Sequence, residues 1–140
     1  MASLLNTNAP MSSEISMILQ LAALGVLVIG FIIVKQRKYM PHGVTMFIAT
    51  VLNIVSVATV MLPVALRLED TSIPGFNLLF RSHIILGIAI LAISVWIIAD
   101  WRFQKPGPTC FQRKNWMLGL GLVWTAQLII GMLLFLKLYM

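Results

Sequence analysis

The two histidines are the residues of this chain best suited to do chemistry inside a membrane. His42 stands in the stretch MPHGVTM and His83 in FRSHIILGIAIL, each at the edge of a long apolar run. An ionisable side chain in such a run indicates a cofactor ligand, a proton relay or a polar contact to a partner. We therefore take His83 and His42 as the candidate cofactor-binding residues, with haem b as the cofactor to consider.

The predicted positions of the histidines argue against a haem that both would ligate. His42 opens the second apolar run and His83 lies about one turn inside the third, which places them roughly 25 Å apart along the membrane normal. Two nitrogens on one iron would lie about 4 Å apart, because each metal–nitrogen distance is about 2 Å. We expect no cofactor within this chain alone, and a haem b held by His83 with a ligand from another chain remains the alternative.

The sequence contains no other set of residues typical of catalysis or of a metal site. It has four acidic residues and one cysteine, and no carboxylate pair, nucleophile with a base, or cluster at ligand spacing stands out. We therefore expect a protein that is not an enzyme and has no metal centre of its own.

The composition predicts that these residues are positioned by membrane-spanning elements. Of 140 residues, 60% are hydrophobic and 10% are charged, and the mean hydropathy is +0.98. A helix needs about 20 apolar residues to cross a hydrocarbon core of about 30 Å. Four runs meet this length, and we predict spans over residues 15–34, 44–66, 78–99 and 116–136.

The fold class follows from the lack of hydrogen-bond partners for the backbone in the lipid core. Every N–H and C=O group must be satisfied within a helix or a closed barrel, and the four runs lack the alternation of barrel strands. The sequence predicts an all-α four-transmembrane-helix bundle with short loops. Residues 15–140 would form a single domain after a short extracytoplasmic tail, residues 1–14.

The distribution of charge predicts the orientation. Net charge is +6, and seven of the ten cations fall in the two links that follow the first and third spans. By the positive-inside rule these loops face the cytoplasm and both termini face outward. We expect no nucleic-acid partner. We expect anionic lipid headgroups at the inner face to contact Lys35, Arg37, Lys38, Arg113 and Lys114.

Small and polar residues within the spans predict where helices approach one another. Gly, Ser and amide side chains let membrane helices pack closely and hydrogen-bond. The second span carries a polar stripe that begins at His42, which we interpret as interhelical contacts, with a conduction path as the alternative. The residues predicted to contact other helices or another subunit are Asn53, Ser56, Gly87, Gly119, Gly121, Gln127 and Gly131.

The layout of these motifs resembles the domain-of-unknown-function family numbered 420. The resemblance rests on MPHGVTM, on FRSHIILGIAIL and on QRKNWMLGLGLVWTAQLIIGMLL, and it covers nearly all of the chain after the first span begins. It implies a small four-helix membrane protein, and some members of that family are implicated in maturation of haem-copper oxidases. Gly43 stands where members often have arginine, and Gln112 and Arg113 stand where they have a further histidine, so a histidine-based cofactor role is weakened here.

Three functions are compatible with these features. The first is a non-catalytic accessory subunit or assembly factor of a larger respiratory or metal-dependent membrane oxidoreductase. The second is a b-type haem electron-transfer protein that uses His83. The third is a small transporter or proton-conducting protein that uses the polar stripe of the second span.

Overall fold

The computed structural model describes residues 8–68, 76–102 and 112–139, and within these ranges the chain forms helices and turns but no strand. A π-helical segment, Val57–Met61, joins α2 to α3 in one continuous helix. Four helices are long and apolar enough to cross a membrane: α1, the joined α2 and α3, α4, and α6. The predicted all-α fold with four membrane-spanning helices is therefore confirmed. The helices are α1 (Met11–Lys35), α2 (Tyr39–Ser56), α3 (Leu62–Leu68), α4 (Phe76–Trp101) and α6 (Lys114–Tyr139).

Each predicted span lies inside a helix that continues beyond it at both ends. Hydropathy marks only the part that crosses hydrocarbon, whereas the helix continues where water or headgroups can meet its terminal groups. Pro41 is accommodated in the first turn of α2, because N–H groups of a first turn have no intrahelical partner. The link between α1 and α2 is consequently only three residues, and Arg37 adopts a positive φ of 61° to close it.

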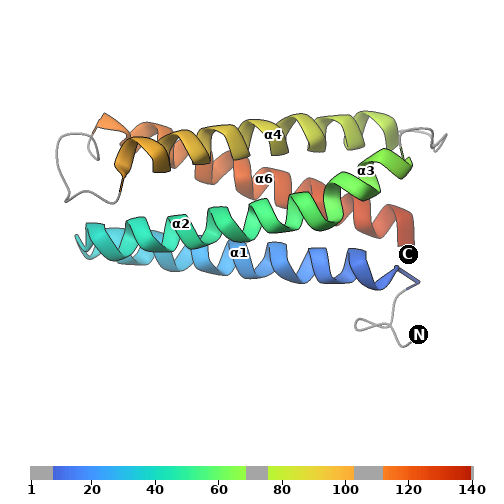
Figure 1. Ribbon diagram of the computed structural model, residues 1–140, viewed down its shortest axis with the longest axis horizontal. Helices are drawn as coiled ribbons and strands as arrows, with labels where there is room; N and C mark the ends of the chain where they lie inside the picture. Colours follow the sequence, from blue (N-terminus) through green and yellow to red (C-terminus); the bar gives the residue numbers. More distant parts are fainter. Residues whose placement is uncertain (1–7, 69–75, 103–111, 140) are drawn as a thin grey trace.

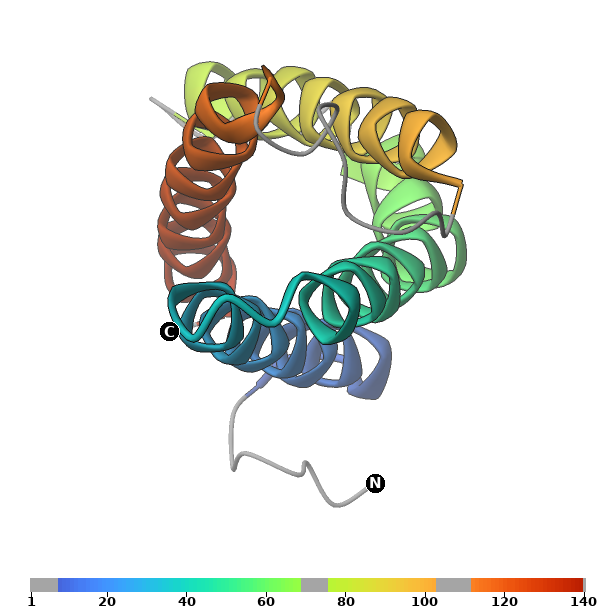
Figure 2. The same cartoon turned by 90° about the vertical axis from the view of Figure 1, so that its left-hand side faces the viewer.

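The four long helices surround a common axis as two hairpins. Seen from the end that holds the α1–α2 link, they follow one another around a ring in the order α1, α2, α4, α6 (Figure 2). α1 packs chiefly on α2, and α4 packs chiefly on α6. The first turn of α1 and the last turn of α6 meet at the opposite end (Figure 1), where the hydroxyls of Ser13 and Tyr139 lie 3.2 Å apart. That this end faces outward stays a prediction from the charge distribution.

The contact between α1 and α2 follows a heptad pattern. Buried residues of α1 recur at alternating spacings of three and four, the geometry in which side chains of two helices interlock along a seam. The buried residues of the second long helix recur at spacings of seven, four and three. Small and polar side chains of the two helices therefore meet in layers. The buried residues with this spacing are Ser13, Ser16, Gln20, Ala23, Leu27 and Gly30 on α1, and His42, Ala49, Asn53, Ser56 and Val60 on the facing helix.

The middle of the bundle is filled by one large side chain, that of Trp124. This residue is 1% exposed and belongs to a cluster with Ile90 of α4, Leu128 of α6 and two alanines, Ala23 and Ala49, from the first hairpin. The small residues leave the space that the indole occupies. All four long helices are thereby packed around one ring at mid-membrane.

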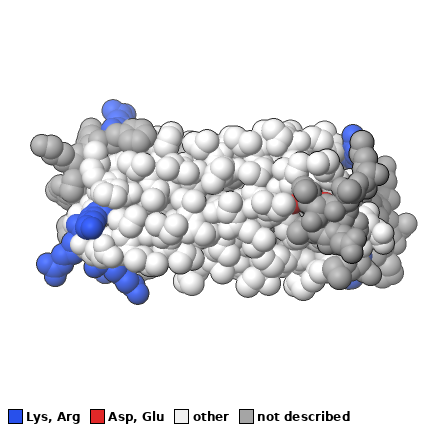
Figure 3. Space-filling view, turned by 90° about the horizontal axis from the view of Figure 1, so that it is seen from below, with Lys and Arg blue, Asp and Glu red and all other residues white. Residues whose placement is uncertain are grey.

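The surface of the bundle is that of a protein surrounded by lipid. Large apolar side chains are exposed on every long helix, for example Ile29, Val44, Ile85 and Leu122. Lys and Arg gather at the ends of the molecule, and the body between them is uncharged on the face that Figure 3 presents. This distribution, together with the four spanning helices, indicates a multi-pass membrane protein.

A bend in the second long helix opens the end at which α1 begins. Pro63 has no N–H to offer the carbonyl of Thr59, and the π-helical segment lies directly before it. The Thr59 hydroxyl bonds the carbonyl of Val55 at 2.7 Å, so it does not replace the missing bond. Beyond the bend α3 leans away from α1 (Figure 1). The bend at Pro63 therefore leaves space between the helices.

Two glycines of α6 permit a matched test of this packing. Gly121→Ala should lower the free energy of unfolding by about 1 kcal/mol, because the added methyl would lie 2.6 Å from Cζ of Phe31 on α1. Gly119→Ala adds the same methyl where nothing lies within 4 Å, and it should not lower stability, since alanine favours helix over glycine. Reversible titration from dodecyl maltoside into SDS, followed by circular dichroism, measures both. An equal loss in the two variants would contradict the close contact at Gly121.

Candidate functional site

The space opened by the bend is a cavity of about 270 Å³, here called the terminal cavity. It lies between α1, the bent helix, α4 and α6, at the end of the bundle where α1 begins and α6 ends. Leu62 and Ile88 belong to its lining and are 56% and 64% exposed, so the cavity reaches the lipid-facing surface. A ligand could therefore enter it from the membrane.

The walls of the terminal cavity differ in polarity. The wall formed by the π-helical segment and α3 is apolar and includes Val60, Met61 and Ala65. The walls formed by α1, α4 and α6 add hydroxyl, amide and imidazole groups. A mostly apolar lining with a few convergent polar groups is the usual character of a small-molecule site. The polar lining residues are Ser13, Ser16, Gln20, His83, Gln127 and Tyr139.

His83 lies on the wall of the terminal cavity against the backbone of α6. A Cβ at Gly131 would lie 3.0 Å from Cε1 of His83, so the ring packs directly on the α6 backbone, close to Gln127. A Cβ at Gly87 would lie 2.6 Å from Nε2 of Gln127, so the amide covers that glycine of α4. Gly131 therefore makes room for His83, and Gly87 makes room for the Gln127 amide, between α4 and α6. The sequence predicted these three residues, Gly87, Gln127 and Gly131, as contacts to other helices or another subunit.

The polar stripe of α2 is hydrogen-bonded to α1. Ser16 and Ser56 are joined through their hydroxyls at 3.1 Å, and Nε2 of Gln20 donates to Oδ1 of Asn53 at 3.2 Å. Asn53 is 1% exposed, and its Nδ2 has no hydrogen-bond partner within the described residues. Polar groups of this layer thus link the first hairpin while Ser16 and Gln20 also face the terminal cavity.

His42 lies at the other end of the bundle, where it contacts the backbone of α1. Its Nδ1 is 2.8 Å from the carbonyl oxygen of Gly30, across the α1–α2 seam. The neighbouring Gly43 faces the ring of Trp101 at the end of α4. Because 18 residues of α4 separate His83 from Trp101, the two histidines are about 27 Å apart along the helix.

The described residues do not fit a haem ligated by both histidines. The separation along α4 exceeds by far the spacing of two ligands on one iron. Over residues 8–68, 76–102 and 112–139, no group of three or more His, Cys, Asp and Glu side chains is placed to hold a metal ion. A haem held by His83 would need its second axial ligand from a group other than His42.

A second polar cluster lies at the rim where α4 ends and α6 begins. Nε of Arg113 is 3.1 Å from Oδ2 of Asp100, and the guanidinium lies 4.1 Å from the ring centroid of Trp96. Trp96 meets Trp116 edge to face, with the ring centroids 5.7 Å apart. Arg113 is thus engaged with α4, whereas Lys35, Arg37, Lys38 and Lys114 are exposed for contact with headgroups.

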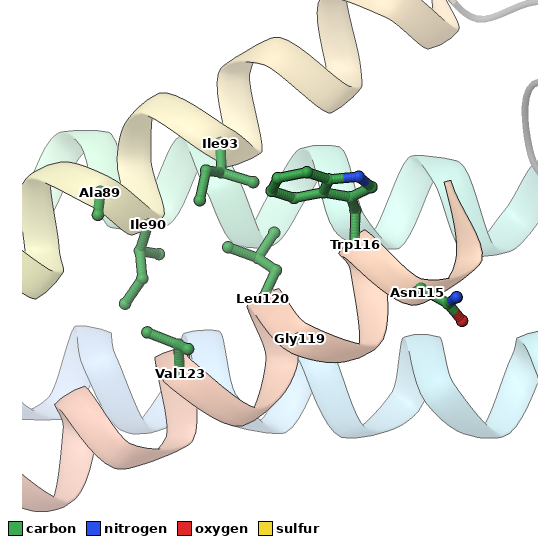
Figure 4. A pocket seen from close by; sticks show the side chains of 8 residues that line it. All are labelled: Ala89, Ile90, Ile93, Asn115, Trp116, Gly119, Leu120 and Val123. Atoms are coloured by element: carbon green, nitrogen blue, oxygen red, sulfur yellow. The ribbon is translucent and has the colours of Figure 1, made fainter. Parts of the chain in front are cut away.

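An apolar groove of about 340 Å³ lies between α4 and α6, and its lining includes the exposed residues Ala89, Trp116 and Gly119. In Figure 4, Ile90 and Ile93 point from α4 toward Leu120 and Val123 of α6, and the ring of Trp116 lies across one end beside Ile93. Gly119 forms part of the groove, and a Cβ there would meet nothing within 4 Å. Four glycines were predicted to contact other helices. The protein's own side chains fill the space beside Gly87, Gly121 and Gly131, whereas the space beside Gly119 is open.

Sequence analysis missed several residues of the terminal cavity. Ser13, Ser16 and Gln20 belong to the heptad seam of α1, and Tyr139 joins them from the last turn of α6. The spacing of three and four between small and polar residues from Ser13 to Gly30 was a signal for this face. No comparable signal marks Tyr139, because its contact to Ser13 joins the two ends of the chain. Glu14 is fully buried in the first turn of α1.

Comparisons of this chain with known protein families, with curated proteins and with solved structures found no match.

Proposed function

We propose that the protein is a non-catalytic accessory subunit or assembly factor of a larger membrane oxidoreductase. The observation that carries the proposal is the groove between α4 and α6 with Gly119 at its wall. An open glycine beside an apolar groove lets a foreign helix approach the α6 backbone closely. We infer that a transmembrane helix of a partner subunit lies there.

The difference between Gly119 and Gly121 supports a partner at this place. Both glycines lie on α6, but the space over Gly121 is filled by Phe31 of the same chain. Over Gly119 the described residues supply no side chain, and the groove has Ala89 as a further small residue. Packing and small residues drive association of helices in lipid, because apolar surface alone gains little there.

The oxidoreductase character of the partner comes from the resemblance to the family numbered 420. The motifs around His42 and His83 carry that resemblance, and it links such proteins to haem-copper oxidase maturation. The proposed orientation, with the Lys35 end in the cytoplasm, follows the positive-inside rule. A respiratory or other metal-dependent complex is the partner class that these features favour.

Purification from native membranes in a mild detergent, with quantitative mass spectrometry, tests the proposal. We expect stoichiometric recovery of the subunits of one redox enzyme for a stable subunit, or substoichiometric recovery of one such enzyme for an assembly factor. Gly119→Leu should reduce this recovery about tenfold by filling the site of approach, which corresponds to about 1.4 kcal/mol of binding free energy. Gly25→Leu is the matched control, since Gly25 on α1 also has nothing within 4 Å. Recovery without any redox subunit, or an equal loss in both variants, would contradict the proposal.

A b-type haem protein is the second candidate, because His83 lines a cavity that opens to lipid. A second axial ligand would come from a partner chain, and His83 would hold the iron from α4. The reduced-minus-oxidised spectrum of protein purified with its partners decides this candidate, and the absence of a b-type band would exclude it.

A further inference from the structure

We propose that the terminal cavity binds the head of a lipid-soluble quinone or quinol, with His83 and Gln127 as its hydrogen-bonding residues. The proposal concerns a ligand of this chain and does not depend on the accessory role proposed above. It begins from the volume of the cavity. Protein interiors are packed to crystal-like density, and about 270 Å³ equals roughly nine waters at about 30 Å³ each. A mostly apolar space of this size is more favourably filled by a single-ring molecule.

The chemistry of the lining selects a neutral ligand. Its polar groups are hydroxyls, amides and an imidazole, and no Asp, Glu, Lys or Arg is among the described residues that line it. A phosphate or carboxylate head would be buried without a counter-charge, which is strongly unfavourable. Headgroups of anionic phospholipids and free fatty acids are therefore poor occupants.

Two groups on the polar wall offer hydrogen bonds to such a ligand. Nδ1 of His83 is buried and has no hydrogen-bond partner among the described residues, and the Gln127 side chain on the same wall is 5% exposed. A hydrocarbon chain in the cavity would leave this imidazole nitrogen without a partner, at a cost in free energy. An amide and an imidazole each donate and accept, so they suit both the carbonyl of a quinone and the hydroxyl of a quinol.

Aromatic side chains and the opening toward lipid also suit a quinone with its isoprenoid tail. Phe80, Phe135 and Tyr139 line the cavity, and the last two rings lie 5.1 Å apart between centroids. Such rings pack well on a planar ligand. The exposed Leu62 and Ile88 at the surface provide a way for an isoprenoid tail to leave the cavity into the lipid.

Binding of decylubiquinone to purified protein in nanodiscs tests the proposal, with empty nanodiscs as the blank for partitioning. We expect saturable binding of one molecule per chain. Gln127→Leu should weaken binding about tenfold, as expected for loss of a hydrogen bond in an apolar site. Ala65→Phe should abolish binding by filling the cavity from its apolar wall. If Gln127→Leu is misfolded, Ala65→Phe still tests whether the quinone binds in the cavity. Thr125→Val removes a hydroxyl from the same helix outside the cavity and should bind as the wild type does.

Three outcomes would overturn the proposal. The first is no saturable binding above empty nanodiscs. The second is binding that neither Gln127→Leu nor Ala65→Phe changes. The third is purified protein that carries phospholipid or haem in the cavity, shown by extraction or by a b-type absorption band, which the quinone does not displace.

Discussion

Trp124→Ala is expected to lower the free energy of unfolding by about 3 kcal/mol, the largest effect of any single substitution considered for this protein. The indole is 1% exposed and packs against Ile90, Leu128 and two alanines at the centre of the bundle. When the helices separate into lipid, the interactions lost are packing contacts and not burial from water. The expected value is therefore at the lower end of the range for Trp→Ala substitutions in water-soluble cores. Reversible titration into SDS, followed by circular dichroism, gives the free energy.

Leu122→Ala is the control for this substitution. Leu122 lies two residues earlier on α6 and is 74% exposed, so its truncation should change stability by less than about 0.5 kcal/mol. Equal losses in the two variants would show that the indole is not packed at the centre of the bundle. A Trp124→Phe variant should recover most of the stability, because a smaller ring still fills part of the space.

Removing the amide of Asn53 is expected to have the second-largest effect. Asn53→Leu should lower the free energy of unfolding by about 1–2 kcal/mol, because the buried Nε2 of Gln20 loses its acceptor. Gln20→Leu should have a similar effect. The double variant should lose less than the sum of the two, with a coupling energy of about 0.6–1.7 kcal/mol, the range for hydrogen bonds between membrane helices.

Ser94→Ala provides the matched control for this cycle. Ser94 is also buried in a membrane helix, but its hydroxyl has no partner among the described residues. Its removal should be neutral or slightly stabilising, since a buried unpaired polar group is itself unfavourable. Strictly additive losses for Gln20→Leu and Asn53→Leu would mean that the two amides do not interact in the membrane.

The sequence was sufficient for the class of fold because hydropathy and backbone hydrogen bonding are properties of local stretches. Four apolar runs long enough to span lipid have no stable conformation there other than helix. The same local information located the stripe of Asn53 and Ser56 and the glycines of α4 and α6. It also placed His42 and His83 in different layers, and the structure puts them about 27 Å apart along α4.

The exact helix ends were less accessible to sequence reasoning. Hydropathy does not distinguish a residue at the end of a helix from one in a short link, so the α1–α2 link is shorter than the runs suggested. Pro41 illustrates the point, because proline interrupts a helix interior but is tolerated in a first turn. Its effect depends on position within the helix, and that position was not known from the sequence.

The sequence by itself determined that this protein is a bundle of four membrane helices with small and polar faces. Only the tertiary structure decided which of those faces meet: Gln127 covers Gly87, Gly131 supports His83, Phe31 fills the space at Gly121, and Gly119 stays open. It also decided that the bend before Pro63 leaves a cavity between Ser16, His83 and Tyr139. The physical reason is that helix formation depends on neighbours along the chain, whereas a cavity or a contact depends on distances between helices. Those distances are set by the packing of all four helices together.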